Sequence, residues 1–405
     1  MDISNIKYKA NYYALLILAF VIPLERKLIA PAIILFFLTS IINLSTNLIA
    51  KKNVLWFGLL YVIYAISVAY ASNTEIGLSD LMTKLSLLIF PVSIFFSNLD
   101  FRQVSHPFFK SFIDGCFAVI VISIIRSILL FYFSLNPSIF FYGEISVYLH
   151  PSYLAMLLCM CNAIIYYYLF FPSSSFNYSK KLSFFLLVLF SVFVLILASK
   201  TGLICMLIIH FFAIGKWIIK NKAFVKGGIV VMLILASLVG IYKFSKVFNE
   251  RMNELMTLSE TDNISNGSTV ARKEIWITAL DLITKKPLLG YGNGDVKEVL
   301  VKEYEKKELK EIAKHQLNAH NQFLQTTLSL GILGGLLLVF MIVVPFYYSI
   351  KNKDYLYLTF LLLIIINFFT ESMLERQVGV VFYALFNSLF FVKILSLNKQ
   401  KVVSE

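Results

Sequence analysis

The stretch NQFLQTTLSLGILGGLLLVFMIVVPFYYSI, residues 321–350, decides the fold class of this protein. It contains no charged side chain, and the first one that follows it is Lys351. A helix needs about 20 mostly apolar residues to cross the hydrocarbon core of a membrane, and this stretch exceeds that length. We therefore predict a membrane-spanning helix over 322–349. Asn321, which directly precedes it, is a suitable N-cap for that helix.

The rest of the chain repeats this pattern. Of its 405 residues, 59% are hydrophobic and only 15% are charged, whereas about a quarter of the residues in a soluble protein are charged. The composition predicts an all-α polytopic membrane protein. We place about twelve spans in it: 10–25, 29–50, 54–72, 81–98, 108–134, 151–171, 182–198, 202–219, 227–244, 322–349, 355–371 and 378–396.

The distribution of Lys and Arg predicts how these spans are oriented. With the N-terminus inside the cell, the short inner segments hold seventeen Lys and Arg residues and the short outer loops hold four. Cytoplasmic loops are the ones enriched in these residues, so we place both termini in the cytoplasm. The same rule accounts for the net charge of +13 without a nucleic-acid partner. The four cysteines lie in apolar runs and are interpreted as small buried side chains.

This topology leaves one long outer segment, residues 245–320, between two predicted membrane regions, residues 1–244 and 321–405. It carries 24 of the 59 charged residues, with both signs mixed, so we expect a solvated helical loop. Apolar residues at helical spacing predict helices over 246–258, 268–286 and 296–317. Between the second and third helices, PLLGYGNGD (287–295) requires a tight turn because of its proline and three glycines.

Two residues of this outer region are the main candidates for chemistry. Arg272 precedes Trp276 by one helical turn, so both side chains share a face. A guanidinium group binds phosphate oxygens in a bidentate manner, although an interfacial Arg that stacks on an aromatic ring has the same pattern. His320 lies beside the predicted N-cap Asn321. An imidazole accepts a proton near neutral pH, and the N-terminus of the helix favours an anion. A purely structural His is the competing interpretation.

Several other polar residues are weaker candidates for binding a substrate. Lys200, in ASKTG, and Arg376, in ESMLERQVG with two glutamates beside it, both fall on the predicted outer side. Lys84 and Arg126 lie within apolar runs, where a charge is costly and is usually paired or functional. For Lys84, a side chain that extends to the outer membrane surface is the alternative. Gln325, one turn into the helix after His320, completes this set.

Three segments carry the most specific patterns of the chain: HNQFLQTTLSLGILG (320–334), ARKEIWITALDLITKKPLLGYGNG (271–294) and ASKTGL (198–203). They resemble motifs of the O-antigen ligases and the related O-antigen polymerases. The first resembles the His-containing helix start after the large periplasmic loop of those proteins, the second is similar to the segment that precedes it, and the third resembles their Ser-Ser-Arg-x-Gly hairpin. Two positions depart from the pattern: Lys200 replaces the usual Arg, and Trp276 stands where the ligases have Leu.

The resemblance implies an inverting, metal-independent glycosyltransferase of the GT-C type that needs no cofactor and acts on the periplasmic face of the bacterial inner membrane. Its donor would be a glycan on undecaprenyl diphosphate, and its acceptor a hydroxyl group of lipid A-core or of another glycan. Arg272 corresponds to the Arg that holds the diphosphate, and His320 to the base that deprotonates the acceptor. Lys200 corresponds to a second cation on the phosphate side, and Asn321, Gln325, Arg376, Arg126 and Lys84 are the remaining candidates for donor or glycan contacts.

Other functions stay open at this point. The nearest alternative is a polymerase that joins repeat units on the same lipid carrier, and a protein-glycosylating relative is a further one. A transporter of lipid-linked sugars would concentrate polar groups near the membrane midplane, often with internal repeats. Here the polar candidates gather at the outer rim of the spans, which favours the transferase.

Overall fold

The protein folds into helices joined by short connections. The computed structural model describes residues 3–44, 48–171, 178–222 and 269–404, together with residues 225, 232, 243 and 249. Throughout these residues the regular structure is helical, and the only strand-like feature there is one isolated bridge between Leu44 and Ser97. The predicted all-α class is thereby confirmed. Apart from residues 232, 243 and 249, the predicted span 227–244 and the predicted loop helix 246–258 lie outside the described residues.

Six helical segments of the described residues are long and apolar enough to cross a membrane. They are Thr74–Phe96, Phe101–Ser134, Pro151–Phe170, Lys200–Asn221, Gln322–Lys351 and Gln377–Ser396. Three shorter apolar helices accompany them: Lys27–Ile42, Trp56–Val68 and Tyr355–Thr370. A multi-pass membrane protein is the class that this set of helices defines.

The chain forms two compact units. The first comprises Met1–Leu18, Ala30–Ser105 and Leu258–Glu405, and the second Ala19–Ile29 and His106–Thr257. Helices α1 (Ile3–Val21), α2 (Arg26–Ile42) and α6 (Phe101–Ser134) are shared between the units. The second unit also contains η1 (Pro137–Phe140), α7 (Tyr142–Ile145), α8 (Pro151–Phe170), α9 (Lys180–Ile196) and α10 (Lys200–Asn221). The predicted hairpin of two helices around ASKTG is therefore present as α9 and α10.

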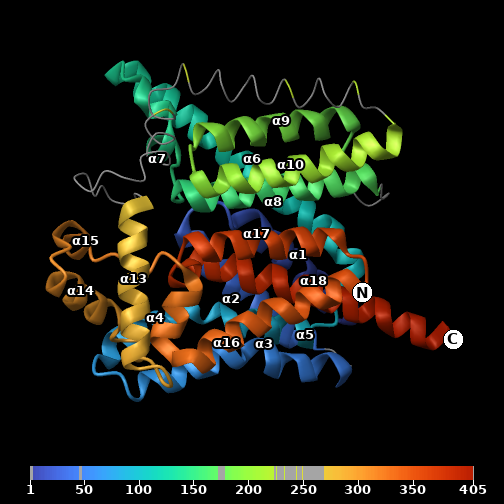
Figure 1. Cartoon of the computed structure of the whole chain (residues 1–405). Coiled ribbons are helices and arrows are strands. Elements are labelled where there is room, and N and C mark those ends of the chain that lie inside the picture. Colours follow the sequence, from blue (N-terminus) through green and yellow to red (C-terminus); the bar gives the residue numbers. More distant parts are fainter. Residues whose placement is uncertain are drawn as a thin grey trace. The chain divides into compact units, whose positions relative to one another are not determined.

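The first unit contains the remaining helices. In chain order they are α3 (Leu48–Val68), α4 (Thr74–Lys84), α5 (Ser86–Phe96), α13 (Thr269–Lys285), α14 (Val296–Lys306), α15 (Lys310–Lys314), α16 (Gln322–Lys351), α17 (Tyr355–Thr370), η2 (Met373–Glu375) and α18 (Gln377–Ser404). In Figure 1, α13 runs crosswise to α17 and α18. Helices α13, α14 and α15 lie at one end of this unit, and both chain ends lie at the other.

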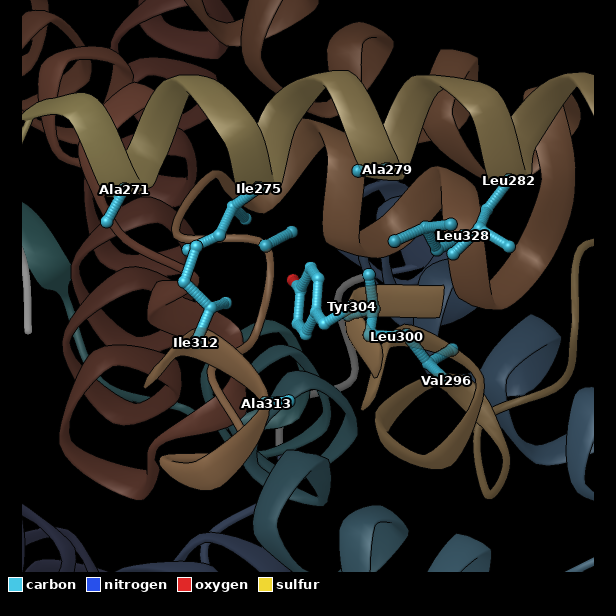
Figure 2. Packing of buried hydrophobic residues seen from close by; sticks show 11 residues of the cluster. Ala271, Ile275, Ala279, Leu282, Val296, Leu300, Tyr304, Ile312, Ala313 and Leu328 are labelled. Carbon is cyan, nitrogen blue, oxygen red and sulfur yellow. The ribbon is translucent and has the colours of Figure 1, made fainter. Parts of the chain in front are cut away.

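A small apolar core joins α13 to the helices beside it (Figure 2). Ala271, Ile275, Ala279 and Leu282 form one face of α13, with each neighbouring pair separated by three or four residues. They pack against Leu300 and Tyr304 of α14, Ile312 of α15 and Leu328 of α16, together with Val296 and Ala313. This burial fixes α13 on the N-terminal part of α16, and Arg272 is next to the first residue of the buried face.

The loop between α13 and α14 packs into a break in α16. Gly331 has φ 71° and ψ −175°, so the helix is interrupted there. The continuous helix that the sequence predicts over 322–349 is therefore wrong at this residue. The backbone N–H groups of Tyr291 and Gly292 donate to the carbonyl oxygens of Leu328 (2.8 Å) and Ser329 (3.0 Å). In return, Ile332 donates its N–H to the Pro287 oxygen (2.8 Å). The loop thus satisfies backbone groups that the break in the helix leaves without partners.

Only glycine fits at the centre of this contact. A Cβ atom on Gly331 would lie 1.9 Å from the Leu288 carbonyl oxygen, and one on Gly290 would lie 2.4 Å from that of Leu328. Both residues also have positive φ angles, which side chains of L-residues disfavour. The tight turn predicted from PLLGYGNGD is present, and its glycines allow two backbones to approach closely.

The same loop is attached to the α3–α4 connection through Asp295. Its carboxylate accepts hydrogen bonds from the N–H groups of Ser72 (2.7 Å) and Asn73 (2.8 Å). Burial opposes ionisation, but the hydrogen bonds from Ser72 and Asn73 and the charge of Lys286 together outweigh it and lower the pKa of Asp295 below its usual value. A Cβ atom on Gly294 would meet the Asn73 oxygen at 2.0 Å, so here too glycine is required by a close approach.

The predicted helix 296–317 is wrong in one respect, because it is two helices. Helix α14 ends at Lys306 and α15 begins at Lys310. Glu308 between them has φ 58°, and the N–H of Leu309 donates to the Tyr304 oxygen (2.9 Å). This pattern terminates a helix and usually requires a glycine. Because the chain has Glu at this position, the break left no signal in the sequence.

Candidate active site

His320 is held in a tight turn at the start of α16. Its φ angle of 42° lies in the left-handed region, which is uncommon for a residue other than glycine. The side chain of Asn318 accepts the His320 backbone N–H at 3.0 Å. The next residue, Asn321, caps α16 by accepting the N–H groups of Phe323 (3.0 Å) and Leu324 (3.1 Å). The predicted cap is confirmed, and its consequence is a fixed position for the His320 ring.

Glu371 brings Arg272 and His320 together. It follows the last residue of α17, and its Oε1 accepts a hydrogen bond from an Nη2 donor of Arg272 at 3.1 Å. Its other carboxylate oxygen, Oε2, lies 3.2 Å from Nδ1 of His320. All three side chains are partly buried, with 22%, 17% and 20% of Arg272, Glu371 and His320 exposed. The two principal candidates from the sequence therefore belong to one site.

This contact determines which ring nitrogen of His320 is available for chemistry. An ionised carboxylate can only accept hydrogen bonds, so Nδ1 must carry the proton that it shares with Glu371. In a neutral imidazole, Nε2 is then the nitrogen with the free electron pair. A carboxylate that orients a histidine in this way is the arrangement found in enzymes whose histidine acts as a general base.

Glu371 is a site residue that the sequence alone did not identify, since it was only one of two glutamates near Arg376. The available signal was a carboxylate at the predicted outer end of a span, on the same side as Arg272 and His320. Without a structure, that placement could not distinguish Glu371 from Glu375, four residues later. The structure separates their contacts, because Glu375 faces Lys84.

Lys84 supports the segment that carries Glu371. Its side chain is fully buried, and its Nζ lies 2.9 Å from Oε2 of Glu375 and 3.9 Å from a carboxylate oxygen of Asp80. The Nζ atom also lies 5.0 Å from the centre of the Tyr64 ring. An outward-extended Lys84 is therefore the wrong alternative for this residue, because the partly buried Glu375 and Asp80 and the Tyr64 ring stabilise the charge inside the protein.

Gln322, in the first turn of α16, holds the same segment from another direction. Its Oε1 accepts the backbone N–H of Leu374 at 2.6 Å, and its Nε2 donates to the Thr326 hydroxyl at 3.0 Å. The Tyr64 hydroxyl also lies 3.0 Å from that of Thr326. Segment 371–376 is thereby attached to the helix that begins beside His320, which restrains the Glu371 carboxylate relative to the ring.

The remaining candidates have different surroundings. Gln325 is buried, and its Oε1 accepts the Ala319 N–H at 3.2 Å, so it stabilises the turn before His320. Arg376 is exposed. Arg126 and Lys200 belong to the second unit, where Arg126 donates to the Glu144 carbonyl oxygen at 2.8 Å and Lys200 begins α10 after the N-cap Ser199.

Two buried donors on α13 have no hydrogen-bond acceptor among the described residues. They are Nε of Arg272 and the indole Nε1 of Trp276, one turn further along the helix. A buried N–H group without an acceptor costs roughly 1–3 kcal/mol. Arg272 also contacts Glu371, so its free Nε is suited to an oxygen atom of a molecule bound at this site.

Comparison with known proteins supports the resemblance that the motifs predict. The site lies in a multi-pass α-helical membrane protein whose cation, carboxylate and histidine meet at the end of a helix. Residues 185–339 match the family model described as O-antigen ligase, which confirms the similarity to the O-antigen ligase and polymerase superfamily over that region. The matched region includes Lys200, Arg272 and His320.

A related protein from Haemophilus influenzae gives a weaker comparison. This uncharacterized protein is 25% identical to the chain over 149 residues. The aligned region is 35% of this chain and 37% of the relative, so the chain spans little more than a third of the curated protein that it matches. Its name assigns no activity.

Proposed function

We propose that the protein is a membrane glycosyltransferase of the O-antigen ligase type. It transfers a glycan from undecaprenyl diphosphate to a hydroxyl group of lipid A-core. The observation that carries this proposal is the pair of contacts from Glu371 to Arg272 and His320. These contacts combine a phosphate-binding cation with an oriented base, and the family match over 185–339 supplies the class of reaction.

In the proposed reaction, Nε2 of His320 removes the proton from the acceptor hydroxyl group. The acceptor oxygen attacks the anomeric carbon of the donor sugar while the bond from that carbon to the diphosphate oxygen breaks. The electron pair of the broken bond remains on the diphosphate, and attack from the opposite side inverts the configuration. A positioned base accelerates such a step by about 10²–10⁴-fold.

Arg272 is the group that we assign to the leaving diphosphate. Its guanidinium uses one donor for Glu371, and its Nε is buried without an acceptor among the described residues. A donor already oriented toward developing negative charge stabilises the transition state without reorganisation. Lys200 is proposed as a second phosphate-side cation, and this assignment rests on the resemblance of ASKTGL alone. In this scheme the cations neutralise the diphosphate without a metal ion.

We further propose about twelve spans, a GT-C type arrangement and both termini in the cytoplasm. The site would then face the periplasm from the bacterial inner membrane. The corresponding divisions are a membrane region over residues 1–244, an outer loop over 245–320 and a second membrane region over 321–405. The charge distribution of the short loops and the family match support this placement.

The second candidate function is a polymerase that joins repeat units on the same carrier. Trp276, which replaces the Leu of the ligase pattern, favours it. A deletion strain examined for its lipopolysaccharide ladder separates the two. Loss of all polymer from lipid A-core supports the ligase, and a single attached repeat unit supports the polymerase. An unchanged ladder, with wild-type amounts of lipid-linked glycan, would refute both.

Complementation of that strain tests the assigned residues. We expect His320→Ala and Arg272→Ala to abolish transfer while the protein still reaches the membrane. His315→Ala is the matched control for the first variant, because His315 is exposed and pairs with the exposed Glu311. Lys273→Ala, at an exposed position next to Arg272, is the control for the second. Wild-type transfer by His320→Ala would refute the assignment of the base.

A further inference from the structure

An apolar and basic tip follows α13, and the proposed reaction does not use it. Residues 284–289, TKKPLL, are all exposed. The side chains of Leu288 and Leu289 are the most prominent part, at 70% and 63% exposed. Burying a leucine side chain normally contributes to stability, so two adjacent ones left open at the end of a helix call for a partner.

The position of the tip along α16 identifies the membrane as its surroundings. The part of α16 before Gly331 has no exposed residue, whereas Ile332, Leu333 and Leu336 directly after it are exposed and apolar. From Ile332 to Lys351 the helix has a length of about 20 residues, which matches the hydrocarbon core of a bilayer at roughly 30 Å. The lipid-facing surface of α16 therefore begins at the break.

The tip is attached to α16 at this break, where the lipid-facing surface of the helix begins. Pro287 accepts the Ile332 N–H at 2.8 Å, and the Leu288 oxygen lies close enough to Gly331 to exclude a Cβ atom there. Leu288 and Leu289 therefore continue the apolar surface of α16. The backbone hydrogen bonds of the loop also explain how an irregular segment is tolerated at this depth, because its polar groups are satisfied by α16.

Helix α3 gives independent evidence that the tip lies at the edge of the lipid-facing surface. Its exposed apolar residues Leu59, Val62 and Ile66 form one stripe, which leads to Tyr70 after the end of the helix. Tyr70 is 42% exposed, and its hydroxyl donates to the Leu289 carbonyl oxygen at 2.6 Å. Tyrosine is enriched where a membrane meets water. Two lipid-facing stripes, from α3 and α16, thus end at the same two leucines.

We propose that residues 284–289 are a membrane anchor of α13, inserted into the leaflet on the His320 side. Leu288 and Leu289 contact the acyl chains next to Leu333, and Lys286 contacts the phosphate groups of anionic lipids. The exposed residues Ile277 and Leu280 lie on α13 at helical spacing ahead of the tip and extend the apolar surface along it. This interaction is independent of the identity of the glycan and of the reaction.

Spin labels on the full-length protein test the proposal in vesicles of phosphatidylcholine and phosphatidylglycerol in equal parts. Single cysteines at Leu288 and Leu289 are labelled in a background in which the native cysteines, all buried, are replaced: Cys116, Cys159, Cys161 and Cys205. The measured quantity is the collision rate with oxygen, which concentrates in lipid, divided by that with a water-soluble nickel chelate. Labels at Leu333 and at the exposed Glu298 of α14 are the matched lipid and water references.

We expect the ratios at 288 and 289 to equal that at Leu333 and to exceed the Glu298 ratio several-fold. Ratios equal to the Glu298 value would overturn the proposal, provided that the labelled proteins keep the parent melting temperature. Leu288→Trp gives a second measurement, in which brominated lipids should quench the new fluorescence. Lys286→Glu should lower the ratio at 289 in these vesicles but not in pure phosphatidylcholine. An equal effect in both would remove the anionic headgroup contact.

Discussion

The contact of Glu371 with both Arg272 and His320 makes Glu371→Gln the most informative substitution. The amide keeps the size of the side chain but has one acceptor oxygen in place of two, and it carries no charge. It can satisfy either the guanidinium at 3.1 Å or the imidazole Nδ1 at 3.2 Å, but not both as the carboxylate does. If the amide NH₂ faces His320, the ring adopts the other tautomer and Nε2 is no longer a base.

The expected loss follows from the role of the base. An oriented general base contributes about 10²–10⁴-fold, so we expect kcat of Glu371→Gln to fall by a factor in that range. The free energy of unfolding should fall by only about 1–3 kcal/mol, because the contact with one of the two partners persists. Glu371→Asp, which keeps the charge on a shorter side chain, should recover part of kcat.

The assay is transfer by the purified protein in vesicles, with lipid-linked glycan as donor and lipid A-core as acceptor. Glu311→Gln is the matched control, because Glu311 is exposed, pairs with the exposed His315 at 3.7 Å and should not affect transfer. A Glu371→Gln enzyme with wild-type kcat would refute the orientation of His320 by this carboxylate. A rise in KM with unchanged kcat would do the same, because it would assign Glu371 to substrate binding alone.

Three further substitutions test how the site is supported. Gly331→Ala should lower the melting temperature strongly. The added Cβ would lie 1.9 Å from a carbonyl oxygen, and a backbone with φ 71° and ψ −175° costs a residue other than glycine about 1–3 kcal/mol. Gly215→Ala, with open space around the added Cβ, is the control. Lys84→Met should lower the free energy of unfolding by about 3–5 kcal/mol, because it leaves Glu375 unpaired. The double variant Lys84→Met with Glu375→Leu should recover most of that loss, as measured by thermal unfolding. The pKa of Asp295 is lower in the folded protein than in the unfolded chain, so its carboxylate stabilises the fold at pH values above the unfolded pKa of about 3.9. This contribution is lost as the pH falls through the folded pKa. Asp295→Asn should therefore weaken the fall of the melting temperature at acidic pH, and an unchanged fall would contradict this.

The features of the site that could be predicted depend on neighbouring residues in the chain. Asn321 caps α16 because its side chain reaches the N–H groups two and three positions later, which is a property of the sequence NQFL itself. The turn at 287–295 follows in the same way from its proline and glycines. Arg272 and His320 could be identified through their position at the outer rim of the spans and through their resemblance to known motifs.

The features that could not be predicted depend on residues far apart in the chain. His320 and Glu371 are 51 positions apart, and Lys84 and Glu375 are 291 apart. Neither pair shares a helix, so no periodic pattern relates its members. The break at Gly331 is also a tertiary effect, because a glycine in an apolar run is compatible with a continuous helix until another backbone supplies the hydrogen bonds that the helix loses.

Helix α16 explains why the motifs around Arg272 and His320 occur together. Its beginning positions His320, its Gln322 holds the segment that carries Glu371, and its break at Gly331 receives the loop that follows α13. Besides the apolar core that includes Leu328, α13 is thus attached to α16 at both ends: indirectly through Glu371 near Arg272, and directly through the loop at the other end. Two attachments restrict rotation of α13 as well as its distance from α16. The glycines of the loop thus contribute to the geometry of Arg272 and His320, although none of them touches either side chain, and their spacing is part of the requirement for a working site.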